Sequence, residues 1–339
     1  MDSINNHCSE VKTSKTPNLF SVQHFCLHDG PGTRSIIFFK GCPLRCVWCQ
    51  NPESWLLKPE LAYKHTLCID CKTCVEVCPE KAISAPGEWD KERCTLCFKC
   101  VEACPSGAMA RFGETQAVDE VLDELRPEYT FYQTSDGGVT LSGGEVTLFP
   151  DYASDIARSL QDDGIHVAIE TCGQFKLDKN VVEKVSSEIL GSSIKSPVWK
   201  LLSKVDLVLF DIKVFDSVLH KVLCGTGNED IKQNFKTLTQ IARKSRGPKV
   251  WPRLPLIPDM TDSPDNLTNW AAFLLENGIS QLTIVPYHNL GGSKRAWIGK
   301  EPAPYIPSLS DEALNNSIRV LTNAGIRCYA PGEEDWASL

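Results

Sequence analysis

The stretch Cys42-Pro43-Leu44-Arg45-Cys46-Val47-Trp48-Cys49 places three cysteines in the spacing C-x3-C-x2-C. Three thiolates in one short loop can bind three irons of a [4Fe-4S] cluster, which leaves the fourth iron without a protein ligand. An open coordination position is what separates catalytic from structural metal sites. The alternative is a zinc site that a distant histidine completes. The loop therefore predicts a catalytic iron–sulfur site.

Eight further cysteines form two blocks with the shared spacing C-x2-C-x2-C-x3-C-P, at residues 68–79 and 94–105. This is the bacterial ferredoxin signature, in which the last cysteine of each block ligates the other block's cluster. Two structural zinc sites are the alternative, but zinc has no use for the repeated C-P ending. We assign one cluster to Cys68, Cys71, Cys74 and Cys104, and the other to Cys94, Cys97, Cys100 and Cys78. The remaining cysteines have no regular spacing and are interpreted as ordinary thiols: Cys8, Cys26, Cys172, Cys224 and Cys328.

Composition restricts the classes of partner and compartment. The chain has 339 residues, of which 42% are hydrophobic, and 35 basic against 43 acidic side chains give a net charge of −8. Such a balance provides no overall positive field for nucleic acid or for an anionic membrane, so neither is expected as a partner. The sequence has no run of 18 uncharged apolar residues and no apolar N-terminal segment. A cytoplasmic location is expected, where thiols bind metals more often than they form disulfides.

Strand-like and helix-like segments alternate along the chain. Six β-rich runs each lead into polar or glycine-containing segments, and helical patterns separate them. The predicted strands are 36–39, 139–141, 167–169, 207–210, 251–256 and 282–285, and the predicted helices are 118–125, 152–163, 230–242, 265–277 and 311–324. Six β/α repeats with apolar strands indicate an α/β fold with a parallel sheet, closed fully or partly into a barrel, with functional groups at the carboxyl ends of its strands.

The cluster loop, with the aromatic Trp48 before its last cysteine, resembles that of the radical S-adenosylmethionine (SAM) enzymes. From about Phe20 to Gly332 the chain is similar to the glycyl radical enzyme activating enzymes, typified by pyruvate formate-lyase activase. The matching segments follow the order of that family: 28–34 (HDGPGTR), 51–53 (NPE), 142–145 (SGGE), 211–213 (DIK), 225–228 (GTGN), 253–258 (RLPLIP) and 286–291 (PYHNLG). Two positions depart from it, because Val146 stands where the family usually has proline and Asp259 where it often has glycine.

The resemblance implies a partial (β/α)6 barrel with an inserted two-cluster ferredoxin-like domain. The expected division is a flexible tail at 1–19, the start of the barrel at 20–58, the insertion at 59–112 and the rest of the barrel at 113–339. The implied reaction is reductive cleavage of SAM to methionine and a 5′-deoxyadenosyl radical, which removes hydrogen from a glycine of a partner glycyl radical enzyme. The implied cofactors are SAM and three [4Fe-4S] clusters, and a flavodoxin or ferredoxin is the expected electron donor. Activating enzymes with this insertion serve the choline, diol or glycerol, hydroxyproline, isethionate, arylacetate and toluene-type enzymes.

The resemblance also assigns roles to single residues. SAM chelates the fourth iron of the cluster on Cys42, Cys46 and Cys49, with Asp29 and Arg253 as catalytic candidates that contact SAM or the incoming peptide. Among the other groups, Trp48 and the neighbouring backbone meet adenine, the Gly143-Gly144-Glu145 turn meets the methionine ammonium, and Asp211 and Lys213 lie near the ribose and carboxylate. The full set expected to bind the cofactor is Trp48, Cys49, Gln50, Gly143, Gly144, Glu145, Glu170, Thr171, Asp211, Ile212, Lys213 and His288. Glu170, Thr171 and Asp211 also resemble the positions of a monovalent cation site.

Two other functions stay open on the sequence alone. One is another radical SAM enzyme that modifies peptides and carries auxiliary clusters. The other is a ferredoxin-like electron carrier with a purely structural barrel, which would release no 5′-deoxyadenosine from SAM.

Overall fold

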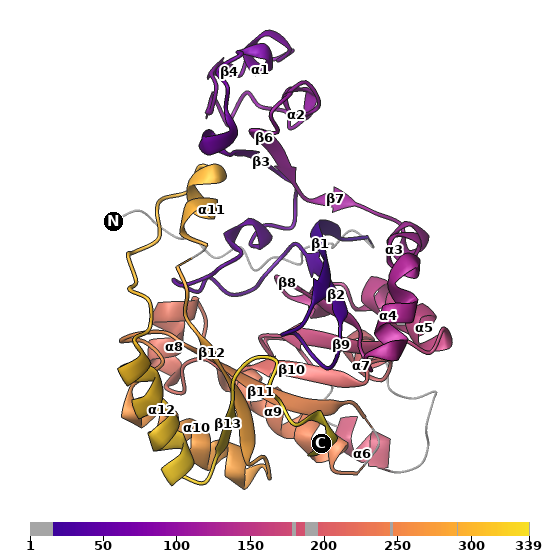
Figure 1. The fold of residues 1–339 in the computed structure, drawn as a ribbon, viewed down its shortest axis with the longest axis vertical. Coiled ribbons are helices and arrows are strands. Elements are labelled where there is room, and N and C mark those ends of the chain that lie inside the picture. The colour runs from indigo at the N-terminus through magenta and orange to yellow at the C-terminus, as the bar shows by residue number, and fades with distance from the viewer. Residues whose placement is uncertain (1–15, 178–180, 187–195, 245–246, 290, 339) are drawn as a thin grey trace.

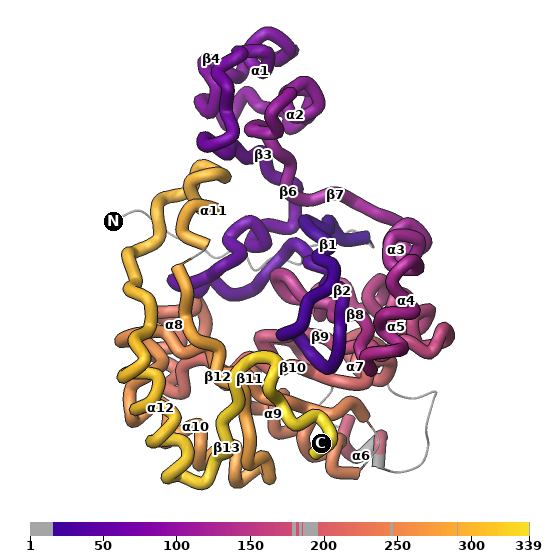
Figure 2. The backbone as a smooth tube through the Cα atoms, in the orientation of Figure 1, coloured from indigo at the N-terminus to yellow at the C-terminus, as the bar shows by residue number. Residues whose placement is uncertain are grey.

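The computed structural model describes residues 16–177, 181–186, 196–244, 247–289 and 291–338. Most of the predicted tail, including Cys8, lies outside these ranges, and the first strand already begins at Asn18. Two parts are visible in Figures 1 and 2: a large body around one sheet, and a small lobe that projects from it. Among the described residues, no helix combines the length and apolar character that crossing a membrane requires.

The large body is built on a nine-stranded sheet. Its order is β13 (Arg327–Tyr329), β12 (Gln281–Pro286), β11 (Lys249–Leu256), β10 (Leu207–Asp211), β9 (His166–Thr171), β8 (Gly138–Gly143), β2 (Arg34–Phe39), β1 (Asn18–Cys26) and β7 (Glu114–Thr115). Seven neighbouring strands run parallel: β2, β8, β9, β10, β11, β12 and β13. At the other edge, β1 pairs antiparallel with both β2 and β7. All six predicted strands are therefore confirmed. The antiparallel strands β1 and β7 were not predicted, and the short strand β13 was missed because only three residues carry it.

Helices follow the strands along the chain and cover the sheet (Figure 1). Their bounds are α3 (Val118–Leu125), α4 (Tyr129–Thr134), α5 (Pro150–Asp162), α6 (Val181–Ser186), α7 (Pro197–Leu202), α8 (Ser217–Cys224), α9 (Glu229–Ala242), α10 (Pro264–Glu276), α11 (Gly292–Trp297) and α12 (Asp311–Asn323), with short 3-10 turns at η1 (Pro52–Ser54), η2 (His65–Leu67), η3 (Arg126–Glu128), η4 (Val146–Leu148) and η5 (Trp336–Ser338). The five predicted helices are confirmed to within two residues at either end. Side-chain caps fix several starts, since Ser263 accepts a hydrogen bond from the backbone of α10 and Ser310 from that of α12.

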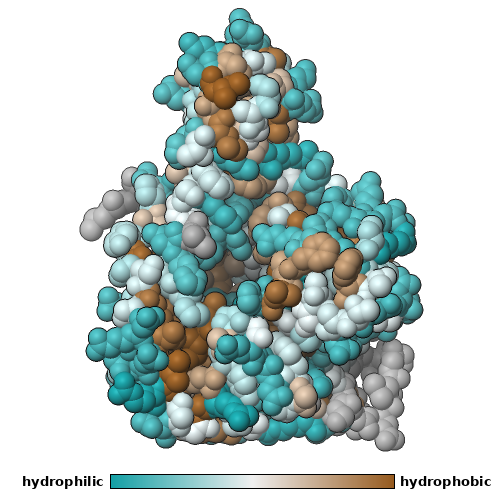
Figure 3. Space-filling model, viewed as in Figure 1, coloured by the Kyte–Doolittle hydropathy of each residue, from teal (hydrophilic) through white to brown (hydrophobic). Residues whose placement is uncertain are grey.

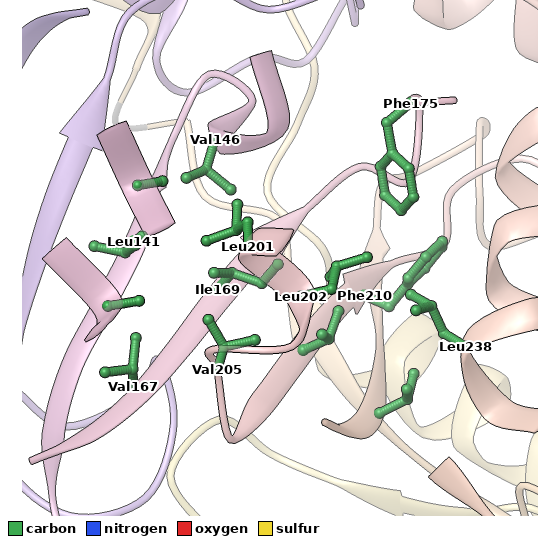
Figure 4. Close-up of a cluster of buried hydrophobic side chains, with 14 of the residues drawn as sticks. Leu141, Val146, Val167, Ile169, Phe175, Leu201, Leu202, Val205, Phe210 and Leu238 are labelled. Carbon is green, nitrogen blue, oxygen red and sulfur yellow. The ribbon is translucent and has the colours of Figure 1, made fainter. Parts of the chain in front are cut away.

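The main core lies between the sheet and its helices. The strand residues Leu141, Ile169 and Phe210 are buried in this core and pack against apolar side chains of the surrounding elements. Figure 4 shows part of this cluster. On α5, the buried positions Tyr152, Ile156 and Leu160 recur at helical spacing, so one face of the helix packs on the sheet. Each such side chain contributes about 1.5–3 kcal/mol on burial. This packing fixes the strands whose carboxyl ends carry the site.

The small lobe, residues 59–112, contains two antiparallel strand pairs and two short helices. Its elements are β3 (Glu60–Tyr63) with β6 (Met109–Phe112), β4 (Ile83–Ala85) with β5 (Glu88–Trp89), α1 (Thr73–Glu76) and α2 (Lys99–Glu102). The cysteine blocks fold alike, because Lys72 before α1 and Phe98 before α2 both have left-handed backbone. The space-filling view shows the lobe as a narrow projection above the body (Figure 3). The internal duplication seen in the sequence is thus also a duplication of local structure.

Candidate functional site

The cluster loop follows β2 and is held in place by backbone hydrogen bonds. Arg45 N–H donates to the carbonyl of Cys224 at 2.8 Å, and Val47 N–H donates to that of Leu223 at 3.0 Å, so the end of α8 brackets Cys46. At the start of the loop, Gly41 donates to Ser54 at 2.6 Å. Gly41 has φ of +101°, a conformation that favours glycine. The loop is therefore shaped by contacts with two other segments of the chain.

A cavity of about 460 Å³ opens between this loop and the inner face of the sheet. It brings together most of the predicted site residues, from six different strands or the loops after them. Those on its wall are Asp29, Cys42, Cys46, Trp48, Cys49, Gln50, Gly143, Gly144, Glu170, Thr171, Asp211, Lys213 and Arg253. Of the residues predicted to bind SAM, three are not among its lining: Glu145, Ile212 and His288. Parallel strands explain the convergence, since their carboxyl ends meet at one edge.

His288 lines a second, adjoining cavity of about 340 Å³. Trp48 and Gln50 belong to the walls of both cavities, and Gln50 Oε1 accepts a hydrogen bond from Gly291 N at 2.7 Å. That bond ties the cluster loop to the segment after β12. The exposed His288 therefore stands at one end of a continuous depression, with the cluster loop at the other.

The backbone of neighbouring segments leaves no room for a side chain at Gly143 or Gly144. A Cβ on Gly143 would lie 2.3 Å from the nitrogen of Phe39, and one on Gly144 would lie 2.0 Å from the oxygen of Gly41. The Glu145 carboxylate is fully buried and accepts hydrogen bonds from the hydroxyls of Thr147 and Thr171 and from two backbone N–H groups. In this structure the carboxylate thus ties β8 to β9, away from the cavity wall.

An acid–base cluster forms another part of the cavity wall. The Arg253 guanidinium contacts the Glu170 carboxylate and lies 3.3 Å from Asp29 Oδ1. Ser142 also donates to Glu170. Burial raises the pKa of Glu170 to about 7, although the Arg253 charge opposes that shift. The Nε atom of Arg253 is buried and has no hydrogen-bond partner, so it is available to a ligand.

At the end of β10, Lys213 Nζ donates to Asp211 Oδ2 at 3.0 Å. Burial by itself would lower the pKa of Lys213, but Asp211 and the thiols of Cys46 and Cys172 raise it above its ordinary value. The lysine is therefore a fixed positive charge beside the cluster loop. Ile212, between these two residues, is fully buried in the main core and does not reach the cavity.

The thiols of the cluster loop have neighbours that the sequence did not single out. A hydrogen bond with Cys172 lowers the pKa of Cys42, whereas a hydrogen bond with Cys224 and burial raise the pKa of Cys46. Burial and the nearby Cys46 raise the pKa of Cys49 to about 12. Cys172 and Cys224 were interpreted as ordinary thiols because no spacing connects them to the loop. Only the position of Cys172 next to Glu170 and Thr171, the site residues predicted after strand 167–169, could have marked it.

In the small lobe, the thiols influence one another in two groups. The pKa of Cys74 is raised by burial and by the nearby Cys104 and Cys68. Burial raises the pKa of Cys100 to about 11, and its thiol neighbours are Cys94, Cys97 and Cys78. Within the described ranges, no three His, Cys, Asp or Glu side chains are arranged around a point where a single metal ion would fit.

The two departures from the family pattern are accommodated locally. Val146 begins η4 and is fully buried in the main core, so the turn after Glu145 forms without proline. Asp259 has φ of +61°, which explains why glycine suits this position. Aspartate tolerates left-handed backbone better than most residues do.

Residues 36–271 match the family model described as the radical SAM superfamily. The chain is 38% identical to the choline trimethylamine-lyase activating enzyme of Oleidesulfovibrio alaskensis over 87% of this chain and 92% of that protein. It is 37% identical to the (2S)-3-sulfopropanediol sulfolyase activating enzyme of Bilophila wadsworthia, over 84% and 90%, and 36% identical to the trans-4-hydroxy-L-proline dehydratase activating enzyme of Clostridioides difficile, over 82% and 86%. The chain belongs to the radical SAM superfamily and, within it, to the glycyl radical enzyme activating enzymes.

Proposed function

We propose that this activating enzyme holds its SAM-binding [4Fe-4S] cluster on Cys42, Cys46 and Cys49. The carrying observation is that these three thiols share one cavity wall with the groups expected to bind SAM. When bound and reduced, the cluster supplies the electron that cleaves SAM to methionine and a 5′-deoxyadenosyl radical, which takes a hydrogen atom from a glycine of the partner enzyme. The protein contributes placement of the ligands and exclusion of water.

The chemistry of the cavity supports an orientation for SAM. The buried ammonium of Lys213 and the unpartnered Nε of Arg253 are donors suited to a carboxylate. The Glu145 carboxylate already accepts hydrogen bonds from four protein donors. We therefore propose that Asp211 and the backbone of the Gly143-Gly144 turn bind the ammonium group of the methionine part of SAM. The adenosyl group would then occupy the depression toward Trp48, Gln50 and His288.

Asp29, Glu170 and Arg253 lie together on the cavity wall, and we propose that the glycine-bearing peptide arrives beside them. Their pairing supports a positioning role for the acids and leaves Arg253 as the cationic group. A monovalent cation on Glu170, Thr171 and Asp211 would compete with Arg253 for the Glu170 carboxylate. We therefore propose the guanidinium as the positive charge at this point.

For the small lobe we propose an inserted domain, residues 59–112, with two further [4Fe-4S] clusters. The thiol neighbourhoods support crossed ligation, since Cys74 has Cys104 as a neighbour and Cys100 has Cys78. Clusters at this position would relay electrons from a flavodoxin or ferredoxin to the barrel. The remainder of the barrel would then comprise residues 20–58 and 113–339.

The partner of this chain is a glycyl radical enzyme of one of the classes that the relatives' names represent, among them choline, sulfopropanediol and hydroxyproline enzymes. Anaerobically reconstituted protein, reductant and SAM would be mixed with each candidate, and electron paramagnetic resonance (EPR) would look for the glycyl doublet. We expect a doublet with one candidate. Cys46→Ala should give none, while Cys328→Ala, a cysteine on β13, should match the wild type. Cleavage of SAM without a doublet for any glycyl radical enzyme would instead favour another peptide-modifying enzyme.

A further inference from the structure

Each cysteine of the cluster loop has a neighbouring side chain from outside the loop that can donate a hydrogen bond to its sulfur. For Cys42 this neighbour is Cys172, the first residue after β9. Cys172 is buried, lines the same cavity and packs in the same apolar cluster as the loop. Its backbone N–H is held by the Glu145 carboxylate at 2.9 Å, and Glu145 N–H in turn donates to Gly41 at 2.7 Å. The thiol is thus fixed relative to the start of the loop.

For Cys46 the neighbour is Cys224, the last residue of α8. Cys224 is fully buried. The backbone bonds from Arg45 and Val47 to the end of α8 flank Cys46 on both sides, so they hold the two thiols against each other. Gly225, with φ of +90°, ends the helix at this point.

For Cys49 the neighbour is Trp55, whose indole contacts the Cys49 thiol. Three cations surround the Trp55 ring: Arg45 at 5.6 Å, Arg295 at 4.8 Å and Lys300 at 5.0 Å from its centroid. These contacts restrain the ring. The indole N–H can only donate, so its partner must be an acceptor.

A thiolate that binds iron carries no proton. In each of the two cysteine pairs, the proton therefore belongs to Cys172 or Cys224, which makes both of them donors in the loaded enzyme. Hydrogen bonds to the sulfurs of an iron–sulfur site stabilise added negative charge and so tune its reduction potential. We propose that Cys172, Cys224 and Trp55 are positioning residues that donate to the three ligand sulfurs and raise the reduction potential of the SAM-binding cluster. This inference rests on the proposed function of the loop.

The test is a redox titration of the reconstituted holoenzyme, followed by EPR. Only the part of the [4Fe-4S]+ signal that changes on adding SAM is measured, which separates this cluster from those proposed for the lobe. We expect Cys172→Ala, Cys224→Ala and Trp55→Phe each to shift its midpoint to a more negative potential. Cys172→Ser and Cys224→Ser keep a donor and should stay at or above the wild-type potential. Cys328→Ala is the matched control and should cause no shift.

Trp55→Phe keeps all sixteen cysteines and the ring for the three cations, so it carries the test even where an alanine variant does not take up iron. Unchanged midpoints in Trp55→Phe and in the iron-replete alanine variants would overturn the inference. Shifts of the same size in the serine and alanine variants would also overturn it, since packing would then be the cause. A wild-type signal that does not respond to SAM would instead overturn the proposed function.

Discussion

The cluster loop and the small lobe hold their cysteines in different ways. The loop is fixed by backbone hydrogen bonds to α8 and to Ser54, and its Leu44, Cys46 and Trp48 are buried together with apolar side chains from several other elements. In the lobe, the buried core consists of Leu61, Cys74, Ile83, Cys100 and Met109, so two of its five members are themselves predicted ligands. A core of that size does not stabilise a domain of this length without metal. The large body thus positions the cluster loop by its own packing, whereas we expect the lobe to depend on what its cysteines bind.

The largest expected effect is on the loop. Cys46→Ala should abolish formation of 5′-deoxyadenosine, because the cluster that activates SAM loses a ligand. Iron content should fall from about 12 to about 8 per chain, since the clusters of the lobe persist. Iron analysis and product chromatography check both. Loss of all iron would show that the two regions do not assemble independently.

The converse change is in the lobe. Cys100→Ala removes a ligand and a core side chain that is only 7% exposed. We expect cleavage by limited proteolysis within 59–112, while cleavage of SAM with dithionite continues. Proteolysis that starts in the large body instead would contradict the proposed independence. Cys328→Ala, which leaves both regions intact, is the control.

The connection between the two regions is the next test. Lys40 at the end of β2 is fully buried and donates to Glu60 of β3 at 2.9 Å. Lys40→Met should lower the free energy of unfolding by about 3 kcal/mol, because it removes a fully buried ammonium and leaves the partly buried Glu60 carboxylate with one cation fewer. Lys91→Met removes another contact between the lobe and the large body, an exposed bond to Gly299, and should change stability by less than about 0.5 kcal/mol. Urea unfolding of both variants distinguishes these outcomes.

A pH effect is expected in the large body. Burial, together with the nearby Arg34 charge, lowers the pKa of His166 to about 4. The unfolded chain binds a proton at this residue below about pH 6.5, so stability is complete above that value and falls as the pH drops toward 4. In His166→Asn this part of the acid sensitivity should disappear. Parallel pH profiles of unfolding for the two proteins would contradict the assignment.

The smallest effect is expected at Asp259. Replacing it by glycine removes the backbone strain of the left-handed conformation in the folded state. Glycine also raises the conformational entropy of the unfolded chain, so the two effects on the free energy of unfolding oppose each other. Stability should change by less than about 1 kcal/mol, and SAM cleavage should not change. A large loss of activity in Asp259→Gly would mean that the carboxylate itself serves the site.

Much of the fold could be predicted from the sequence because its signals are local. Apolar runs such as 207–210 and helical periodicity as in 152–163 do not depend on distant residues, and both appear in the structure. The three-residue strand β13 was missed, since so short a segment forms only through pairing with β12. Ile212 was expected to bind the cofactor because it belongs to the motif Asp211-Ile212-Lys213. Successive side chains at the end of a strand point to opposite faces, so Ile212 lies in the main core instead.

The sequence by itself determined the chemistry that the chain can perform: eleven cysteines at regular spacings and an ordered set of motifs identify the cofactor class and the family. Tertiary structure alone decided which neighbours those cysteines acquire. Cys172, Cys224 and Trp55 contact the loop from separate elements. The Glu145 carboxylate does not line the cavity but accepts a hydrogen bond from Thr171 of β9. Spacing along a chain fixes only local geometry, whereas contacts between distant segments depend on how the sheet and helices pack.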